Sequence, residues 1–406
     1  MRAIHLASLL ALAGGIVVAC STYASDDEQA RPDAGGAVDA AASNDEPDAP
    51  SASDDAGPDG SLALGALNPA CPDPTAGTFP SRSKEVLATP PAGEVEFPFE
   101  IDTDSRSVFW AAQAITIAQL DENGSAVIDA YNGLARSRIR RVSKEPGAQA
   151  ETLVIEQQRT TTIALDGDYV YWPVAISGSA TAIRRVRRDC VAPCTPEPVA
   201  DLDVAAVDHL QRLADGKLFF RRENKDGYLL DVTTTPPGVT KLTTTNPFLT
   251  ATTAGSDLFI GASSEDTIGR ASGPTFSAFT PGWAKLPAPS SGQEKGPVTL
   301  GADCTAVYAA RWDDAVWRVE SDGGTFSRWL DAGADLGQLV STSIDAHHVY
   351  LAAWNAGGVY AIDKKTRSML TLHKGNVWHV FADKDGVYWG EHERSVEAGK
   401  LYTLRR

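Results

Sequence analysis

The sequence predicts an all-β protein built on one seven-bladed β-propeller with four antiparallel strands in each blade. Three observations predict this fold. A unit of apolar strand, turn and aromatic-centred strand occurs seven times, successive units are 38 to 62 residues apart, and no long stretch has helical periodicity. Strand–turn–strand units that repeat at roughly 40–50 residues are typical of propeller blades.

Each unit is recognised by the aromatic residue at the centre of its second strand. Asp and Gly in the turn before it favour a tight hairpin, and valine next to an aromatic favours a strand. Third and fourth strands follow, as in Ile139–Val142 and Thr152–Ile155, which predicts four-stranded blades. The central aromatics are Phe109, Tyr171, Phe219, Phe259, Tyr308, Tyr350 and Tyr388.

The two ends of the repeat region complement each other. The seventh unit stops after a third strand at 400–404, and an orphan strand at 83–88 precedes the first unit. Pairing these strands in one blade would close the ring and remove exposed sheet edges. The 62-residue first interval leaves room for an eighth, irregular unit, so the sequence alone does not separate seven blades from eight.

Residues 1–19 have the features of an export signal. Arg2 and His5 precede an apolar run from Leu6 to Ala19 that is short for a membrane span. The run ends in Val-Val-Ala-Cys20, which resembles a bacterial lipobox. The resemblance implies a lipid on Cys20, and the following Ser21 is similar to lipoproteins of the outer membrane. A plain secretory signal cleaved nearby is the alternative.

Residues 20–80 are expected to form a disordered tether ahead of a propeller domain at 81–406. Ala, Asp, Ser, Gly and Pro dominate residues 21–60, which leaves little to bury. This stretch has eleven acidic residues and one basic residue, and therefore carries more than half of the formal charge of −17. With the acidity concentrated in the tether, we expect no nucleic-acid partner, and we expect a monomer.

Four cysteines remain besides Cys20, which suggests two disulfides in an exported protein. Cys190 and Cys194 flank a turn after a third strand and form the predicted local bridge. Cys71 and Cys304 then pair by elimination. The rival interpretation, a metal site at Cys190 and Cys194, lacks a second close pair of ligands. We predict no metal and no other cofactor.

The repeat resembles bacterial propellers of the TolB-like and NHL/YVTN types. It is most similar to lipoproteins in which Val-Tyr-Trp strands, such as Val170-Tyr171-Trp172, recur behind a lipobox and an Ala/Asp-rich tether. The resemblance is one of pattern and covers about residues 80–406. Those families include scaffolds, binding proteins and a few enzymes, so the fold does not give the function.

Two functions compete. The favoured one is a cell-envelope binding or scaffolding module that recognises a protein or glycan through the loops between second and third strands. An insertion at about 115–136 lengthens the first of these loops, and long loops on a rigid scaffold often carry recognition. The residues expected on this face are Arg221, Arg222, Trp312, Trp354, Glu391 and His392.

The alternative is a hydrolase, lyase or lactonase acting in the central channel, which first strands line. Catalysis would need ionisable groups that converge on one mouth of that channel. The first strands offer Glu100, Arg212 and His379, from three different blades. Nothing in the sequence brings them together, so no catalytic residue is assigned.

Overall fold

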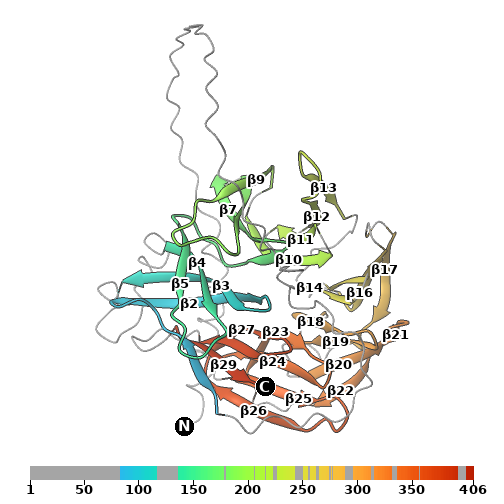
Figure 1. The fold of residues 1–406 in the computed structure, drawn as a ribbon. Helices are drawn as coiled ribbons and strands as arrows, with labels where there is room; N and C mark the ends of the chain where they lie inside the picture. The colour runs from blue at the N-terminus through green and yellow to red at the C-terminus, as the bar shows by residue number, and fades with distance from the viewer. Residues whose placement is uncertain are drawn as a thin grey trace, which may run out of the picture. The chain divides into compact units, whose positions relative to one another are not determined.

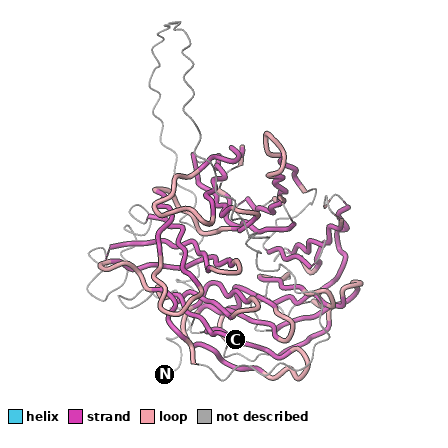
Figure 2. The backbone as a smooth tube through the Cα atoms, viewed as in Figure 1, coloured by secondary structure: helices cyan, strands magenta, loops and turns pink. Residues whose placement is uncertain are grey.

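The computed structural model describes the propeller region with some gaps, and every regular element in the described part is a strand (Figure 2). No helix in these residues is long and apolar enough to cross a membrane. The described residues are 83–116, 136–177, 180–204, 206–214, 216–222, 226–242, 250–254, 257–261, 265–273, 276, 278–288, 296–311, 315–331, 336–355, 357–391 and 399–406.

Seven antiparallel sheets follow one another along the chain as the seven blades (Figure 1). The first three blades are β2 (Glu94–Thr103), β3 (Ser107–Thr116), β4 (Arg136–Ser143) and β5 (Glu151–Glu156); β6 (Ala164–Asp166), β7 (Tyr169–Ser177), β8 (Ala180–Arg187) and β9 (Glu197–Leu202); and β10 (Val207–Ala214), β11 (Lys217–Arg222), β12 (Gly227–Asp231) and β13 (Gly238–Lys241).

The next three blades have the same up-and-down order. They are β14 (Thr250–Ala254), β15 (Asp257–Gly261), β16 (Thr267–Ser272) and β17 (Ala278–Lys285); β18 (Thr299–Ala302), β19 (Ala306–Ala310), β20 (Ala315–Glu320) and β22 (Ser327–Asp331); and β23 (Gln338–Ile344), β24 (His348–Trp354), β25 (Gly358–Asp363) and β26 (Met369–Lys374). The short β21 (Gly324–Thr325) pairs in parallel with the end of β17.

The seventh blade confirms the predicted closure. It has the order β1–β29–β28–β27, so the N-terminal strand β1 (Glu85–Ala88) completes the blade of β27 (Val377–Ala382), β28 (Gly386–Glu391) and β29 (Leu401–Arg405). Glu85 lies opposite Thr403, and Val86 opposite Tyr402. The described chain has seven blades. Residues 117–135, the centre of the predicted insertion, fall between β3 and β4 and lie outside the described residues.

The apolar core lies between neighbouring blades. Trp110, Trp172 and Trp389 are fully buried. Trp110 packs with Leu87 of β1, Ile101 of β2 and Tyr388 of the last blade, so one cluster joins the two ends of the repeat region. Burial of such aromatic side chains stabilises each by about 1.5–3 kcal/mol, and here it also holds one blade against the next.

An aspartate shapes the turn between the first and second strands in four blades. The Oδ1 atom of Asp104 accepts hydrogen bonds from the N–H groups of Arg106 and Ser107. Asp303, Asp345 and Asp383 do the same for the second and third residues after each of them. This local bonding is the reason Asp favours such turns.

The same aspartates bind a cation of the next blade, placed just after its third strand. We call each such pair a latch. Arg188 lies 2.9 Å from Asp104, Lys364 lies 2.5 Å from Asp303, and Arg406 contacts Asp345. Across the closure, Lys144 of the first blade lies 2.5 Å from Asp383 of the seventh. Latches therefore tie neighbouring blades together at the first-hairpin face.

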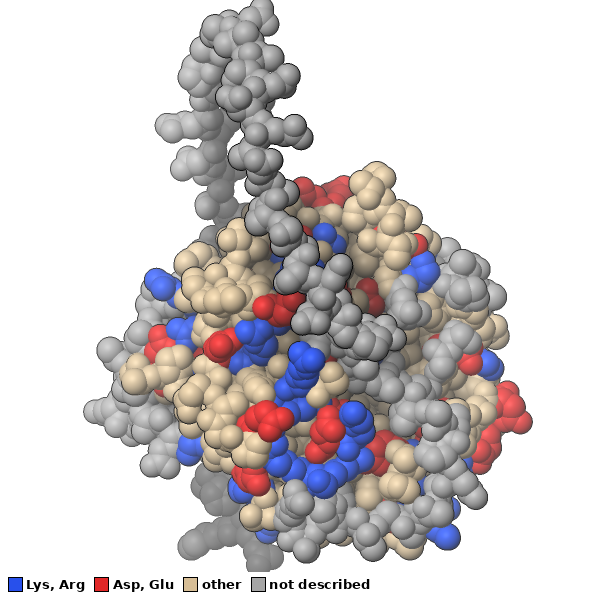
Figure 3. All heavy atoms as spheres, in the orientation of Figure 1, with Lys and Arg blue, Asp and Glu red and all other residues tan. Residues whose placement is uncertain are grey.

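The arginine pairs on third strands have carboxylate partners. Arg140 and Arg141 bind Glu96 and Glu151, Arg184 and Arg185 bind Glu156 and Glu197, and Arg187 binds Asp189. On the face drawn in Figure 3, basic and acidic atoms intermingle. This arrangement pairs the charges within blades and between them.

Candidate functional site

The face proposed for recognition lies at the C-terminal ends of the second strands. Trp354 and Glu391 are the last residues of β24 and β28, and Arg221 and Arg222 end β11. Because all second strands run in the same direction, these residues share one side of the ring, which we call the loop face. Trp312 and His392 come just after second strands and lie outside the described residues.

Both arginines of the loop face are engaged by nearby carboxylates. Nε of Arg221 lies 2.7 Å from Asp208 on the neighbouring first strand, and Arg222 lies 3.4 Å from Asp226. Glu391 accepts a hydrogen bond from Tyr402 at 3.1 Å. These side chains are therefore held in fixed positions, which lowers the entropy lost when a partner binds.

Aromatic side chains gather where the loop face meets the inner strands. Trp378, the second residue of β27, is 42% exposed. Its ring makes edge contacts with Phe99 of β2 at 6.0 Å and with Trp354 at 5.7 Å, measured between ring centroids. Three blades thus contribute to one aromatic group, and Trp378 presents part of its surface to solvent.

Strand pairing identifies one equivalent inner-strand position in each blade. The second-strand residue that follows the central aromatic pairs with a residue of the first strand, and the position meant is one residue earlier on that first strand. Ile101 pairs with Trp110 and Val380 pairs with Trp389, so the positions in these two blades are Glu100 and His379. All seven residues at this position are polar, and we call them the inner ring. They are Glu100, Thr162, His209, Thr250, Thr299, Ser341 and His379.

Side chains of the inner ring join consecutive blades. Thr162 accepts a hydrogen bond from the N–H of Leu210 in the next blade at 2.8 Å, and Thr250 accepts one from Leu300 at 3.2 Å. Ser341 accepts one from Val380 at 3.4 Å. Nδ1 of His379 accepts one from the N–H of Ile101 at 3.2 Å, which puts the proton of the neutral ring on Nε2.

Burial sets the protonation of the three ionisable members. It raises the pKa of Glu100 to about 8; a hydrogen bond from Thr162 acts against this, and the charge of Asp102 adds to it. Burial lowers the pKa of His209 to about 4, helped by Arg221, and that of His379 to about 3, helped by His209. At neutral pH all three are therefore uncharged.

Part of each of these side chains nevertheless stays accessible to solvent. Glu100, His209 and His379 are half-buried, whereas the four hydroxyl residues of the inner ring are buried.

The sequence indicated Glu100 and His379 as channel residues but indicated the wrong residue for the third blade. It offered Arg212 as the channel residue of this blade, whereas His209 occupies the inner-ring position. The physical reason is irregular pairing of β10, which shifts register on both sides of this segment. Arg212 is instead buried close to Asp102, whose pKa is raised by burial and lowered by Arg212. Trp378 was also missed, although it directly precedes His379.

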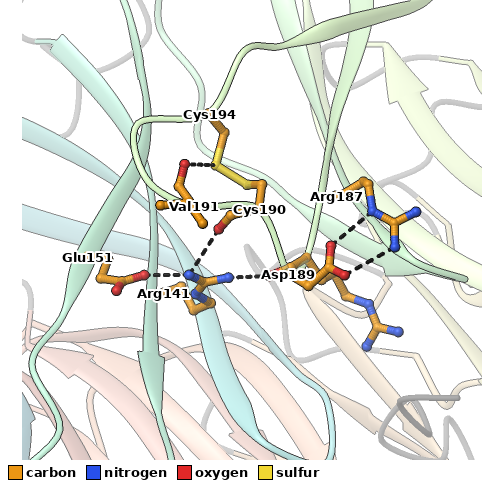
Figure 4. Close-up of a disulfide and its surroundings, with 8 residues drawn as sticks. Arg141, Glu151, Arg187, Asp189, Cys190, Val191 and Cys194 are labelled. Carbon is orange, nitrogen blue, oxygen red and sulfur yellow. Dashed lines mark hydrogen bonds and ion pairs between the residues drawn. A yellow bond between two sulfur atoms is a disulfide. The ribbon is translucent and has the colours of Figure 1, made fainter. Parts of the chain in front are cut away.

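The local disulfide is present between Cys190 and Cys194, with Cα atoms 6.0 Å apart (Figure 4). Arg141 of the first blade reaches this turn and donates to the carbonyl of Cys190 at 3.2 Å while contacting Glu151. The disulfide thus constrains a turn of the second blade that Arg141 of the first blade contacts. Cys304 is also disulfide-bonded. Its predicted partner Cys71, like Cys20, lies outside the described residues, so that pairing stays a prediction.

No protein-family model matches the sequence, and no curated protein matches it. Solved structures match in fold. The structure of U3-55K has a TM-score of 0.53 at 11% identity and covers 81% of this chain and 100% of its own. The WD40 β-propeller domain of Doa1 has a TM-score of 0.53 at 10% identity, covering 81% and 99%.

These similarities and the blade order define the class: the chain is a seven-bladed β-propeller with WD40 propellers as structural neighbours. At such low identity the likeness shows the fold alone. Among the described residues, no group of three or more His, Cys, Asp or Glu side chains is arranged to hold a metal ion.

Proposed function

We propose that this protein is a lipid-anchored protein of the bacterial cell envelope whose propeller binds a protein or glycan partner through the loop face. A propeller is a rigid scaffold that suits binding in general. The observation that carries the proposal is the group of Trp378, Trp354 and Phe99, and the fixed Arg221–Asp208 pair lies on the same face of the ring. Aromatic residues and arginine are the residue types most enriched at binding hot spots.

The proposed address follows from the N-terminal sequence. A lipid on Cys20, Ser21 behind it and an acidic tether to residue 80 would hold the propeller at the outer membrane as a monomer, on its periplasmic or its outer side. Mass spectrometry of the N-terminal peptide from native protein is expected to show a diacylated or triacylated Cys20. An unmodified N-terminus downstream of Cys20 would refute the anchor.

The binding function is tested by affinity capture from envelope extracts of the source cells. Three proteins are compared: the wild type, a variant with residues 117–135 replaced by a short Gly-Ser linker, and Trp378→Ala. The replacement spares β3 and β4, where Ile115 is buried and Arg136 begins a strand. We expect a partner that the wild type retains and at least one variant loses. Equal capture by all three would refute recognition at this face.

A second candidate, catalysis in the channel by a hydrolase, lyase or lactonase, is favoured by Glu100. A carboxyl with its pKa raised to about 8 has a property expected of a general acid. Turnover in a hydrolase and lyase screen that is lost in both Glu100→Gln and His379→Ala would favour this candidate. Turnover unaffected by either substitution would count against it.

A further inference from the structure

We infer that the half of the inner ring formed by Glu100, His209 and His379, together with the exposed Trp378, is a binding site for an uncharged carbohydrate. This inference rests on the proposed binding function and specifies its ligand. Glu100, His209 and His379 come from the first, third and seventh blades respectively, and Trp378 directly precedes His379.

The first step is the hydrogen-bonding capacity that remains at these groups. Glu100 accepts a hydrogen bond from Thr162, and within the described part of the chain no other hydrogen bond reaches it. His379 uses Nδ1 to accept from Ile101, which leaves an Nε2–H donor. His209 interacts with Gln211, and its Nε2 atom is fully buried, so this side chain helps to shape the site. Buried polar groups are normally satisfied, so the unused hydrogen-bonding capacity of Glu100 and His379 indicates a polar ligand.

The second step is charge. Because Glu100 is protonated and both imidazoles are neutral at pH 7, the site offers donors and acceptors without net charge. The nearest charges are already paired: Arg221 with Asp208, and Arg212 beside Asp102. A charged ligand would lose hydration without gaining an opposite charge. A ligand rich in hydroxyl groups, which both donate and accept, fits this arrangement.

The third step is the aromatic neighbour. Trp378 is held edge-on by Phe99 and Trp354 and keeps 42% of its surface exposed next to the inner ring. An ordered indole offers an apolar surface at low entropic cost. The apolar C–H face of a pyranose can pack on such a ring while its hydroxyl groups reach the polar side chains. Hydroxyl-rich ligands that lack an apolar face would not use Trp378.

The test is isothermal titration calorimetry of the full propeller with maltotriose, cellotriose, tri-N-acetylchitotriose and, as a charged comparison, trigalacturonate. We expect at least one neutral trisaccharide to bind and trigalacturonate to bind more weakly. Trp378→Ala and Glu100→Ala should each weaken binding about tenfold or more, whereas Glu100→Gln, which imitates the protonated acid, should bind within about threefold of wild type. Thr299→Ser, on the opposite half of the inner ring, is the matched control.

The dependence on pH is a second readout that a purely structural role for Glu100 would not give. The groups that act on Glu100 are Asp102 on its own strand, Thr162 of the second blade, and Asp208 and Arg221 of the third. Wild-type affinity should fall as pH rises through about 8, and that of Glu100→Gln should not. Circular dichroism at each pH confirms that every variant is folded.

Three results would overturn the inference: no binding by any neutral trisaccharide, binding unchanged in Trp378→Ala, or tighter binding of trigalacturonate. These failures are distinguishable from failure of the proposed function. If a protein partner is captured through the loop face while no saccharide binds, the binding function stands and the carbohydrate site does not.

Discussion

Glu100 and His209 occupy equivalent positions in two blades, and burial acts on both by the same rule. Removal from water disfavours the charged form, so it raises the pKa of the acid and lowers that of the base. At neutral pH Glu100, which would be charged on a surface, is therefore protonated, and His209 stays neutral well below its ordinary pKa. Composition could not show this, because it depends on the position of each residue in the register.

At the residue scale, Glu100 should make the stability of the propeller depend on pH. Its ordinary pKa is 4.5 and its folded pKa about 8, so between these values the folded protein holds one proton more than the unfolded chain. That contribution is fully present below pH 4.5 and is lost as pH rises through about 8, with a slope of at most about 1.4 kcal/mol per pH unit.

Glu100→Gln removes this dependence. The free energy of unfolding of the variant should therefore rise relative to wild type as the pH goes from 6.5 to 8. His209 and His379 influence stability at lower pH, because their pKa values of about 4 and about 3 lie below the ordinary 6.5. Urea denaturation at several pH values measures the difference, and a constant difference across the range would contradict the assignment.

At the scale of elements, the hairpin aspartate has two roles that are visible to different degrees in the sequence. Its turn-forming role is local, and the spacing from Asp to Val-aromatic at Asp303, Asp345 and Asp383 helped to make the blades recognisable. Its latch role depends on a cation 61 to 84 residues away, or 239 across the closure, which only the folded ring brings close.

The same distinction separates what could be predicted in the site from what could not. The ends of second strands follow from the repeat, and Arg221, Trp354 and Glu391 do lie at such ends. The inner ring depends on single-residue register, which the irregular pairing of β10 changes. No single polar residue of a first strand indicated a site in the sequence, because the hydrogen-bond partners of these side chains belong to the next blade.

The latch between the first two blades gives a prediction for stability. Arg188 and Asp104 are each 2% exposed, with 2.9 Å between Nη1 and Oδ2. Arg188→Met leaves the carboxylate buried without its cation, which should lower the free energy of unfolding by about 3–5 kcal/mol. Lys285→Met removes the mostly exposed cation of a pair with Asp266 and should cost less than about 1 kcal/mol.

Urea denaturation of the two variants provides the comparison. A loss in Arg188→Met no larger than that in Lys285→Met would show that the latch does not hold the blades together. Arg188→Met combined with Asp104→Asn should recover part of the lost stability, because the second change removes the unpaired charge while keeping an oxygen for the turn.

At the scale of the whole molecule, the inner ring and the loop face both require a closed propeller. The closing blade takes three strands from the C-terminal end of the chain and β1 from the N-terminal side of the repeat. Without β1, β29 would expose an open edge and the cluster around Trp110 would lose Leu87.

The most direct test of this account compares two neighbouring residues of β1 by chemical denaturation. Leu87 is 8% exposed and packs between the first and last blades, whereas Val86 is 52% exposed on the same strand. We predict that Leu87→Ala lowers the free energy of unfolding of the whole propeller by about 2–4 kcal/mol, and that Val86→Ala changes it by less than about 0.5 kcal/mol. Equal, small effects of both substitutions would mean that β1 does not close the ring.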